Sequence, residues 1–257
     1  MIYPCSDPAT WGPSLDAAVH AVQRGEVVVL PTDTVYGVGA DAFSPGAVAA
    51  VLAAKGRSTQ MPPPVLIPDI STVDGLAREV PDAARALMER FWPGPLTVIV
   101  LSQPSLAWDL GDTHGTVALR VPDHGAARAL LSRTGPLAVT SANRTGEPAA
   151  ITAADAEAQL GTAVAVYLDG GTSPLGQAST IVDATDLAGL RIVREGGVSR
   201  ADVVGVVGED ALWRDTEDAA SGADAAHRPV PADSAKAQAD DQAGADAEGK
   251  GEGESRP

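Results

Sequence analysis

Short apolar runs alternate with amphipathic segments over the first 210 residues of the chain. Runs such as EVVVLP and LTVIVLS have the length and composition of buried strands. We therefore expect strands at 26–31, 63–68, 96–102, 116–122, 137–140, 165–171, 179–184 and 190–196. Apolar residues spaced three and four apart between these runs predict helices at 14–24, 44–54, 81–91, 124–132, 152–160 and 199–207.

Two of the expected helices begin with residues that favour an N-terminus. Ser14 is a candidate N-cap for a helix that runs to Arg24 and ends at Gly25. Ser44 precedes Pro45, and proline is favoured at the first helical position because its fixed backbone angle suits the helix.

The alternation of strands and helices predicts an α/β domain over residues 1–210. The last three strands are joined by short connections. Because parallel neighbours would need long crossover connections, these strands are expected to be antiparallel. We therefore expect one twisted sheet of mixed parallel and antiparallel strands, flanked by helices.

Residues 211–257 differ in character from the rest of the chain. They contain 11 acidic residues, 5 basic residues and 13 alanines, with few large apolar side chains. Such a segment buries too little apolar surface to offset its ordering entropy. We predict a disordered, acidic, alanine-rich tail.

Composition narrows the classes of protein that fit. The formal net charge is -16, which disfavours general binding to nucleic acid backbones or anionic membranes. Cys5 is the one cysteine, so an intrachain disulfide is excluded. The N-terminus lacks the pattern of a secretory leader, and no apolar run is long enough to span a membrane. We expect a soluble, cytoplasmic protein. The glycosylation pattern at 143–145 then has little weight.

Several common catalytic motifs are absent. GGTSPLGQAS has glycines at a P-loop spacing, but Gln177 stands where the phosphate-binding lysine is required. GVGADA lacks the context of a dinucleotide fingerprint. No GxSxG motif occurs, and the four histidines show no metal-ligand spacing.

Three polar clusters remain as candidates for ligand binding. The segment PTDTVYG places Thr32, Asp33, Thr34 and Tyr36 after a buried strand, although a hydrogen-bonded turn would have the same residues. The segment Lys55-Gly56-Arg57 follows an apolar helix, where two cations suit one anion or simply the helix dipole. The segment 140–143 (TSAN) follows another strand, where Ser and Asn could also serve as helix caps.

The three clusters belong to a longer series of motifs: PTDTVYGVGADA, KGR, PGPLTVIV, TVALRVPDH, TSANRTGEP, STIVD and IVREGGV. In this order they resemble the YrdC-like threonylcarbamoyl-adenylate synthase family, over nearly all of residues 15–200. The resemblance implies a fold like that of dihydroxybutanone-phosphate synthase, with a positively charged cavity. It also implies an enzyme that joins L-threonine, bicarbonate and ATP into threonylcarbamoyl-AMP and pyrophosphate, for the modification of adenosine 37 in tRNA.

The resemblance further implies roles for individual residues. Lys55 and Arg57 match the positions that hold ATP phosphates and the forming carbamate, and are the expected catalytic residues. The other expected nucleotide contacts are Thr116, Ser141, Asn143 and Arg194. Those expected for threonine are Thr34, Arg120 and Ser179. Mg²⁺ is expected on the ATP phosphates rather than in a protein cage.

Carboxylation of threonine needs its neutral amine, and the sequence offers no obvious base. Our hypothesis is that the amine loses its proton beside Lys55 and Arg57, which disfavour a third cation.

The sequence departs from the family pattern in two ways. Leu66 stands near the position of a substrate-contacting histidine, so that contact is not carried over. A second folded C-terminal domain, present in longer relatives, is not expected here. Two alternatives also stay open: an RNA- or tRNA-binding module of the same fold, and a carbamoyl-transfer domain, which in its known setting accompanies cysteine motifs that this chain lacks. The expected partners are the transferase that receives the product and, at most, weakly bound tRNA.

Overall fold

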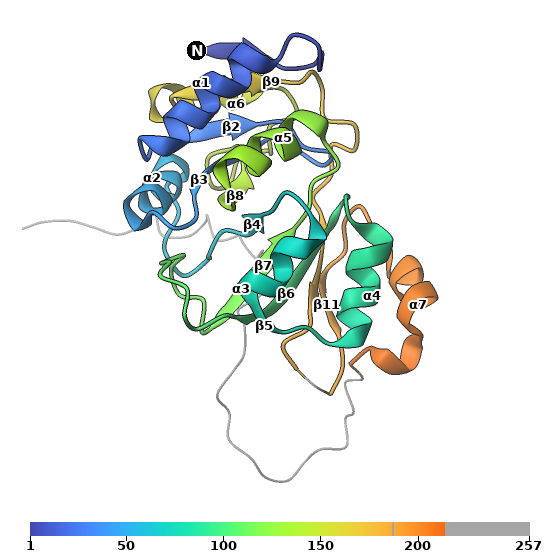
Figure 1. Ribbon diagram of the computed structural model, residues 1–257. Coiled ribbons are helices and arrows are strands. Elements are labelled where there is room, and N and C mark those ends of the chain that lie inside the picture. The colour runs from blue at the N-terminus through green and yellow to red at the C-terminus, as the bar shows by residue number, and fades with distance from the viewer. Residues whose placement is uncertain (187, 214–257) are drawn as a thin grey trace, which may run out of the picture. The chain divides into compact units, whose positions relative to one another are not determined.

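The computed structural model describes residues 1–186 and 188–213, which belong to one unit, Met1–Asp215 (Figure 1). The predicted tail at 211–257 lies almost entirely outside the described residues, so its disorder stays a prediction. Within the described part, no helix is long and apolar enough to cross a membrane.

One mixed sheet organises the described residues. Its strands are β1 (Ile2–Pro4), β2 (Val28–Leu30), β3 (Gly37–Asp41), β4 (Val65–Leu66), β5 (Ala77–Glu79), β6 (Leu96–Ser102), β7 (Thr116–Arg120), β8 (Leu137–Ser141), β9 (Val166–Asp169), β10 (Thr180–Asp183) and β11 (Arg191–Arg194). Their order is β1-β9-β2-β3-β8-β4-β7-β6-β10-β11, with β5 paired to β6.

The predicted mixture of strand directions is confirmed. Strand β9 runs parallel to β1 and β2, and β4 runs parallel to β7. Strand β3 is antiparallel to both β2 and β8. The prediction for the last three strands is correct only for β10 and β11, which are antiparallel. Strand β9 lies near the other edge of the sheet, because the connection after it crosses to β6 instead of turning back.

Helices cover the sheet in three groups (Figure 1). They are α1 (Gly12–Gln23), α2 (Pro45–Lys55), α3 (Val73–Leu76), α4 (Asp82–Phe91), α5 (Gly125–Thr134), α6 (Ala153–Leu160) and α7 (Arg200–Val207). Helices α1 and α5 share one apolar cluster, α2 and α6 a second, and α4 and α7 a third. Burial of these amphipathic faces supplies most of the stabilisation of such helices.

The expected role of Ser14 is wrong. Helix α1 begins at Gly12, and Ser14 lies inside its first turn. The Ser14 hydroxyl donates to the carbonyl of Pro4 at 2.6 Å, so it ties the helix to β1 instead of capping it. Ser44 does precede α2, but its side chain makes no capping hydrogen bond. Thr152 and Ser199 form full capping boxes at α6 and α7.

The glycines of GVGADA belong to a strand, not to a ligand-binding loop. A Cβ atom built on Gly39 would lie 2.5 Å from Cγ2 of Val139 and 2.8 Å from the carbonyl oxygen of Ala138. A Cβ atom built on Gly37 would lie 2.5 Å from Cγ1 of Val139. Side chains here would push β3 away from β8, so close strand packing accounts for both glycines.

The sheet is strongly curled. Three strands, β3, β8 and β4, separate β2 from β7, which is about 19 Å in a flat sheet. Nevertheless Asp33, three residues beyond β2, forms an ion pair of 2.5 Å with Arg120 at the end of β7. The curl therefore brings the segments after two distant strands into one site.

Candidate functional site

Lys55 ends helix α2 and is almost fully buried, with 4% of its surface exposed. Gly56 follows with φ 64°, the left-handed conformation that glycine adopts at least cost, and it ends the helix there. The turn places Arg57 so that its Nη1 donates to the hydroxyl of Thr140 at 3.1 Å. The KGR segment thus delivers two cations to the end of β8.

The ammonium group of Lys55 is surrounded by oxygens of the segment after β8. It donates to the carbonyl of Ser141 at 2.5 Å, to the carbonyl of Asn143 at 2.7 Å and to Asn143 Oδ1 at 3.1 Å. An ammonium has three N–H donors, so these contacts satisfy all of them. Lys55 therefore organises the TSAN segment.

Burial and the neighbouring charge of Arg57 lower the pKa of Lys55 to about 8. Burial also lowers the pKa of Arg57, whose Nε is buried without a hydrogen-bond partner among the described residues. Buried cations with an unused donor favour the binding of an anion, because the pairing would offset the free energy cost of removing the cations from water.

Asn143 holds its own loop together. Its Nδ2 donates to the carbonyls of Arg144 at 2.9 Å and Glu147 at 2.7 Å, while Oδ1 accepts from Lys55. Gln159 of α6 bonds the same loop at the amide of Arg144 and the carbonyl of Pro148. The loop is therefore fixed from two sides.

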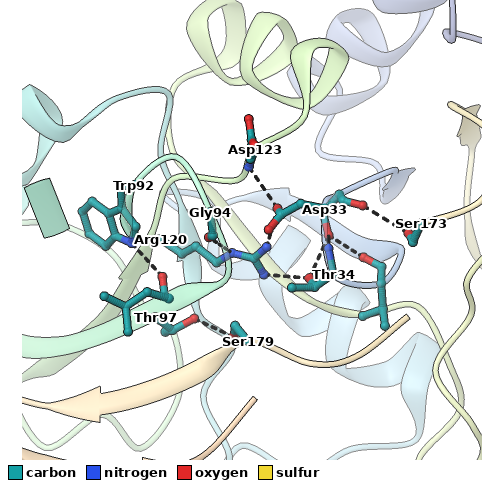
Figure 2. A network of polar contacts seen from close by, with 12 residues as sticks. Asp33, Thr34, Trp92, Gly94, Thr97, Arg120, Asp123, Ser173 and Ser179 are labelled. Carbon is teal, nitrogen blue, oxygen red and sulfur yellow. Dashed lines mark hydrogen bonds and ion pairs between the residues drawn. The ribbon is translucent and has the colours of Figure 1, made fainter. Parts of the chain in front are cut away.

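Arg120 lies at the centre of a second polar group (Figure 2). It is 6% exposed and donates from Nε to the carbonyl of Gly94 at 3.0 Å, from Nη1 to Thr34 Oγ1 at 2.8 Å and from Nη2 to Asp33 Oδ1 at 2.5 Å. Burial lowers the pKa of Arg120, whereas Asp33 raises it. A guanidinium has five N–H donors, so two remain for a ligand.

Ser179 lies just before β10 and continues this group. Its hydroxyl is 2.8 Å from that of Thr97, a buried residue of β6 (Figure 2). The carbonyl of Ser179 accepts from Nε and Nη2 of Arg194 at 3.1 and 2.8 Å. Arg194 therefore lies with Ser179, although its expected role is on the nucleotide side.

The strand register separates the expected site residues into two groups. Leu66 pairs with both Arg120 and Leu137, so Arg120 is level with the start of β8. Thr116 begins β7, four residues and about 13 Å from Arg120, level with the end of β8 at Ser141. The register thus puts Thr116 at the level of Ser141, which bonds Lys55, while Thr34 bonds Arg120.

The sequence did not single out Thr97. A polar residue inside the apolar run LTVIVLS was the available signal. Leu66, near the position of the family histidine, is buried in an apolar cluster with Leu137. Among the described residues, no three His, Cys, Asp or Glu side chains gather to hold a metal ion.

Comparison with known proteins identifies the family. The sequence profile of the Sua5/YciO/YrdC family, described as "Telomere recombination", matches residues 20–196. The chain therefore belongs to this family. A Mycobacterium leprae protein provisionally named threonylcarbamoyl-AMP synthase is 51% identical over 207 residues, which cover 80% of this chain and 94% of that protein. The Bacillus subtilis threonylcarbamoyl-AMP synthase is 38% identical over 78% of this chain and 58% of its own length.

Solved structures agree with these relatives. The Pyrococcus abyssi Sua5 structure in complex with L-threonine is similar with a TM-score of 0.77 and 31% identity, over 83% of this chain and 62% of that chain. Escherichia coli YciO gives a TM-score of 0.68 at 25% identity, over 77% of this chain and 95% of that chain. The chain thus has the family fold and spans less than two thirds of the Sua5 chain.

Proposed function

We propose that this protein is an L-threonylcarbamoyladenylate synthase, which supplies threonylcarbamoyl-AMP for the modification of adenosine 37 in tRNA. The observation that carries the proposal is the pairing of two cationic groups, one beside the end of β8 and one at the end of β7, each with a buried cation. One contains Lys55 and Arg57, and the other contains Arg120. The names of the relatives and the L-threonine bound in the Sua5 structure support the same reaction.

The proposed reaction has two steps. The neutral amine of threonine attacks bicarbonate, which gives a carbamate and releases water. A carbamate oxygen then attacks the α-phosphorus of ATP, and the bond to the departing pyrophosphate breaks. Positioning and charge neutralisation are the main demands in such a transfer.

The Arg120 group is proposed to bind threonine. The two free N–H donors of Arg120 suit the carboxylate, and Thr34 bonds Arg120 directly. Ser179 bonds Thr97 and Arg194, whose charge acts on Arg120. Arg194 bonds Ser179, and this contact supports a role for Arg194 beside the amino-acid group.

The Lys55 group is proposed to bind ATP. Arg57 uses one N–H of its guanidinium fork on Thr140, so the other fork donors remain for phosphate oxygens. Thr116, Ser141 and Asn143 lie at the same end of the strands. The contacts of Lys55 indicate that it first shapes the loop, and that direct contact with a phosphate or the carbamate requires it to exchange one of its present acceptors. Mg²⁺ would enter on the ATP phosphates, because the described residues offer no acidic cage for it.

The proposal places the protein in the cytoplasm, where its ATP and the tRNA-modifying transferase that would receive the product are found.

A direct test mixes the full chain with MgATP, bicarbonate and L-threonine. We expect pyrophosphate release that depends on threonine, and an adenylate of the mass of threonylcarbamoyl-AMP. The alternative is an RNA-binding module of the same fold, which the net charge of -16 disfavours. Tight tRNA binding without any threonine-dependent product would favour that alternative.

A further inference from the structure

A chain of hydrogen bonds links Asp33, Arg120, Thr34 and Thr32, all of them buried. Figure 2 shows the first three. Arg120 donates to Asp33 and Thr34, the Thr34 and Thr32 hydroxyls are 2.9 Å apart, and Thr32 donates to the carbonyl of Val35 at 2.6 Å. Of these four residues, the family resemblance gives a substrate role only to Arg120 and Thr34.

The donor and the acceptor of each hydrogen bond in this series are determined. A guanidinium only donates, so Thr34 Oγ1 accepts from Arg120. A carbonyl only accepts, so Thr32 uses its one hydroxyl proton on Val35. Thr34 must therefore be the donor in its contact with Thr32. Its proton is then used, and one lone pair remains.

The groups left over for a ligand are therefore defined as donors or acceptors. Arg120 retains two N–H donors, whereas the Thr34 hydroxyl is able only to accept. An α-amino acid has a carboxylate that only accepts, and an amine and a β-hydroxyl that donate. The carboxylate therefore fits Arg120, and a donor of the same molecule fits Thr34.

Asp33 fixes the Arg120 end of this chain. Its Oδ1 accepts from Arg120 Nη2 at 2.5 Å and from the amide of Asp123 at 2.9 Å. Its Oδ2 is buried without a hydrogen-bond partner among the described residues. Since that oxygen is sealed from solvent, Asp33 acts on a ligand through Arg120 and not by contact.

We propose that Asp33 and Thr32 are positioning residues of the amino-acid site, which orient Arg120 and the Thr34 hydroxyl so that the carboxylate and a donor group of threonine bind in one orientation. This inference deepens the proposed function and rests on it. Neither residue is among the expected substrate contacts.

The test measures kcat and KM for each substrate in the full chain with three variants. Asp33→Asn keeps an oxygen acceptor but removes the charge. Thr32→Val removes the atom that accepts from both the hydroxyl and the backbone amide of Thr34, and Thr32→Ser restores that atom. Asp74→Asn is the matched control, because it removes the carboxylate of an exposed ion pair with Arg85.

Asp33→Asn is expected to raise KM for threonine about tenfold or more, since it weakens a charged hydrogen bond, while KM for ATP stays within about twofold. Thr32→Val is expected to raise KM for threonine about fivefold, and Thr32→Ser to return it close to the wild-type value. Asp74→Asn should change neither constant. A purely structural role would lower the melting temperature and the active fraction without a selective change in KM for threonine.

An unchanged KM for threonine in folded Asp33→Asn and Thr32→Val would overturn the inference while leaving the proposed function intact. If Asp33→Asn does not fold, Thr32→Val decides alone by the same criterion. If the wild-type protein forms no adenylate, titration calorimetry with L-threonine separates the two proposals. Binding that both variants weaken supports the positioning role without the synthase, and absence of wild-type binding overturns it.

Discussion

The ammonium group of Lys55 binds Asn143 at two points, the carbonyl oxygen at 2.7 Å and the side-chain Oδ1 at 3.1 Å. The loop also bonds back to Lys55, because the amide of Thr145 donates to the Lys55 carbonyl at 2.9 Å. The end of α2 and the loop after β8 are therefore one unit, and a change in either should alter both.

Activity should depend on pH through Lys55. Its folded-state pKa is about 8, below the ordinary value of 10.5. The group is charged below pH 8 and loses its proton as the pH rises through that value, so kcat/KM for ATP should fall on the alkaline side with a midpoint near 8. Lys55→Arg, which stays charged, should retain whatever activity it has to higher pH.

The same shift predicts how stability changes with pH. Between about pH 8 and 10.5 the unfolded state binds more protons at Lys55 than the folded state does. The free energy of unfolding should therefore rise across this window relative to that of Lys55→Met, as measured by urea denaturation. Parallel pH dependences in the two proteins would contradict the shift.

Asn143→Ala should weaken ATP binding and the loop together. The change removes two donor contacts and one acceptor for a buried cation, which should lower the free energy of unfolding by about 1–3 kcal/mol and raise KM for ATP about tenfold or more. Gln159→Ala is the matched control, since it loosens the same loop without touching Lys55. An equal rise in KM in both variants would assign the effect to loop order alone.

Arg57→Ala should reduce kcat/KM for ATP about a hundredfold or more, whereas stability should fall only modestly, because the one hydrogen bond lost is that to the Thr140 hydroxyl. Arg57→Lys should restore little, since a point charge does not replace a planar fork. Arg144→Ala, at an exposed arginine of the neighbouring loop, serves as the control. Near-normal kinetics for Arg57→Ala would remove it from the site.

Gly39→Ala should destabilise the fold by about 1–3 kcal/mol, because its Cβ would overlap Val139 across the strand pair. Gly46→Ala, in α2 with open space around the site of the new Cβ, should instead stabilise by about 0.5–1 kcal/mol. Thermal and urea denaturation of the two variants check the opposite signs.

The sequence predicted the elements whose patterns are local. The strands at β6 and β7 and the helices α4 and α6 lie close to their expected positions, because apolar spacing and capping residues set them. Strand β3 was missed, since its glycines are explained only by Val139 on a strand a hundred residues away. The neighbours of β9 were likewise inaccessible, because pairing between distant strands is decided by tertiary packing.

The candidate site also divides into parts that local sequence patterns predicted and parts that depend on tertiary packing. The clusters PTDT, KGR and TSAN were visible, and their likeness to a family gave Arg120, Thr116, Ser179 and Arg194. What the sequence did not reveal was that Lys55 uses its donors on the loop, or that Arg194 lies beside Ser179. These relations depend on side-chain geometry at the ends of a curled sheet.

Strand β4 lies between β7, which ends at Arg120, and β8, which ends at Ser141. It has two residues, and Val65 pairs with Leu119 and Ala138 while Leu66 pairs with Arg120 and Leu137. A slip of one residue would offset the two neighbouring strands by about 3.3 Å, far beyond the roughly 1 Å misplacement that already impairs a transfer between bound substrates. Under the proposed function, the shortest strand of the sheet therefore sets the alignment of the amino-acid and nucleotide sites, and its burial opposes a shift of register.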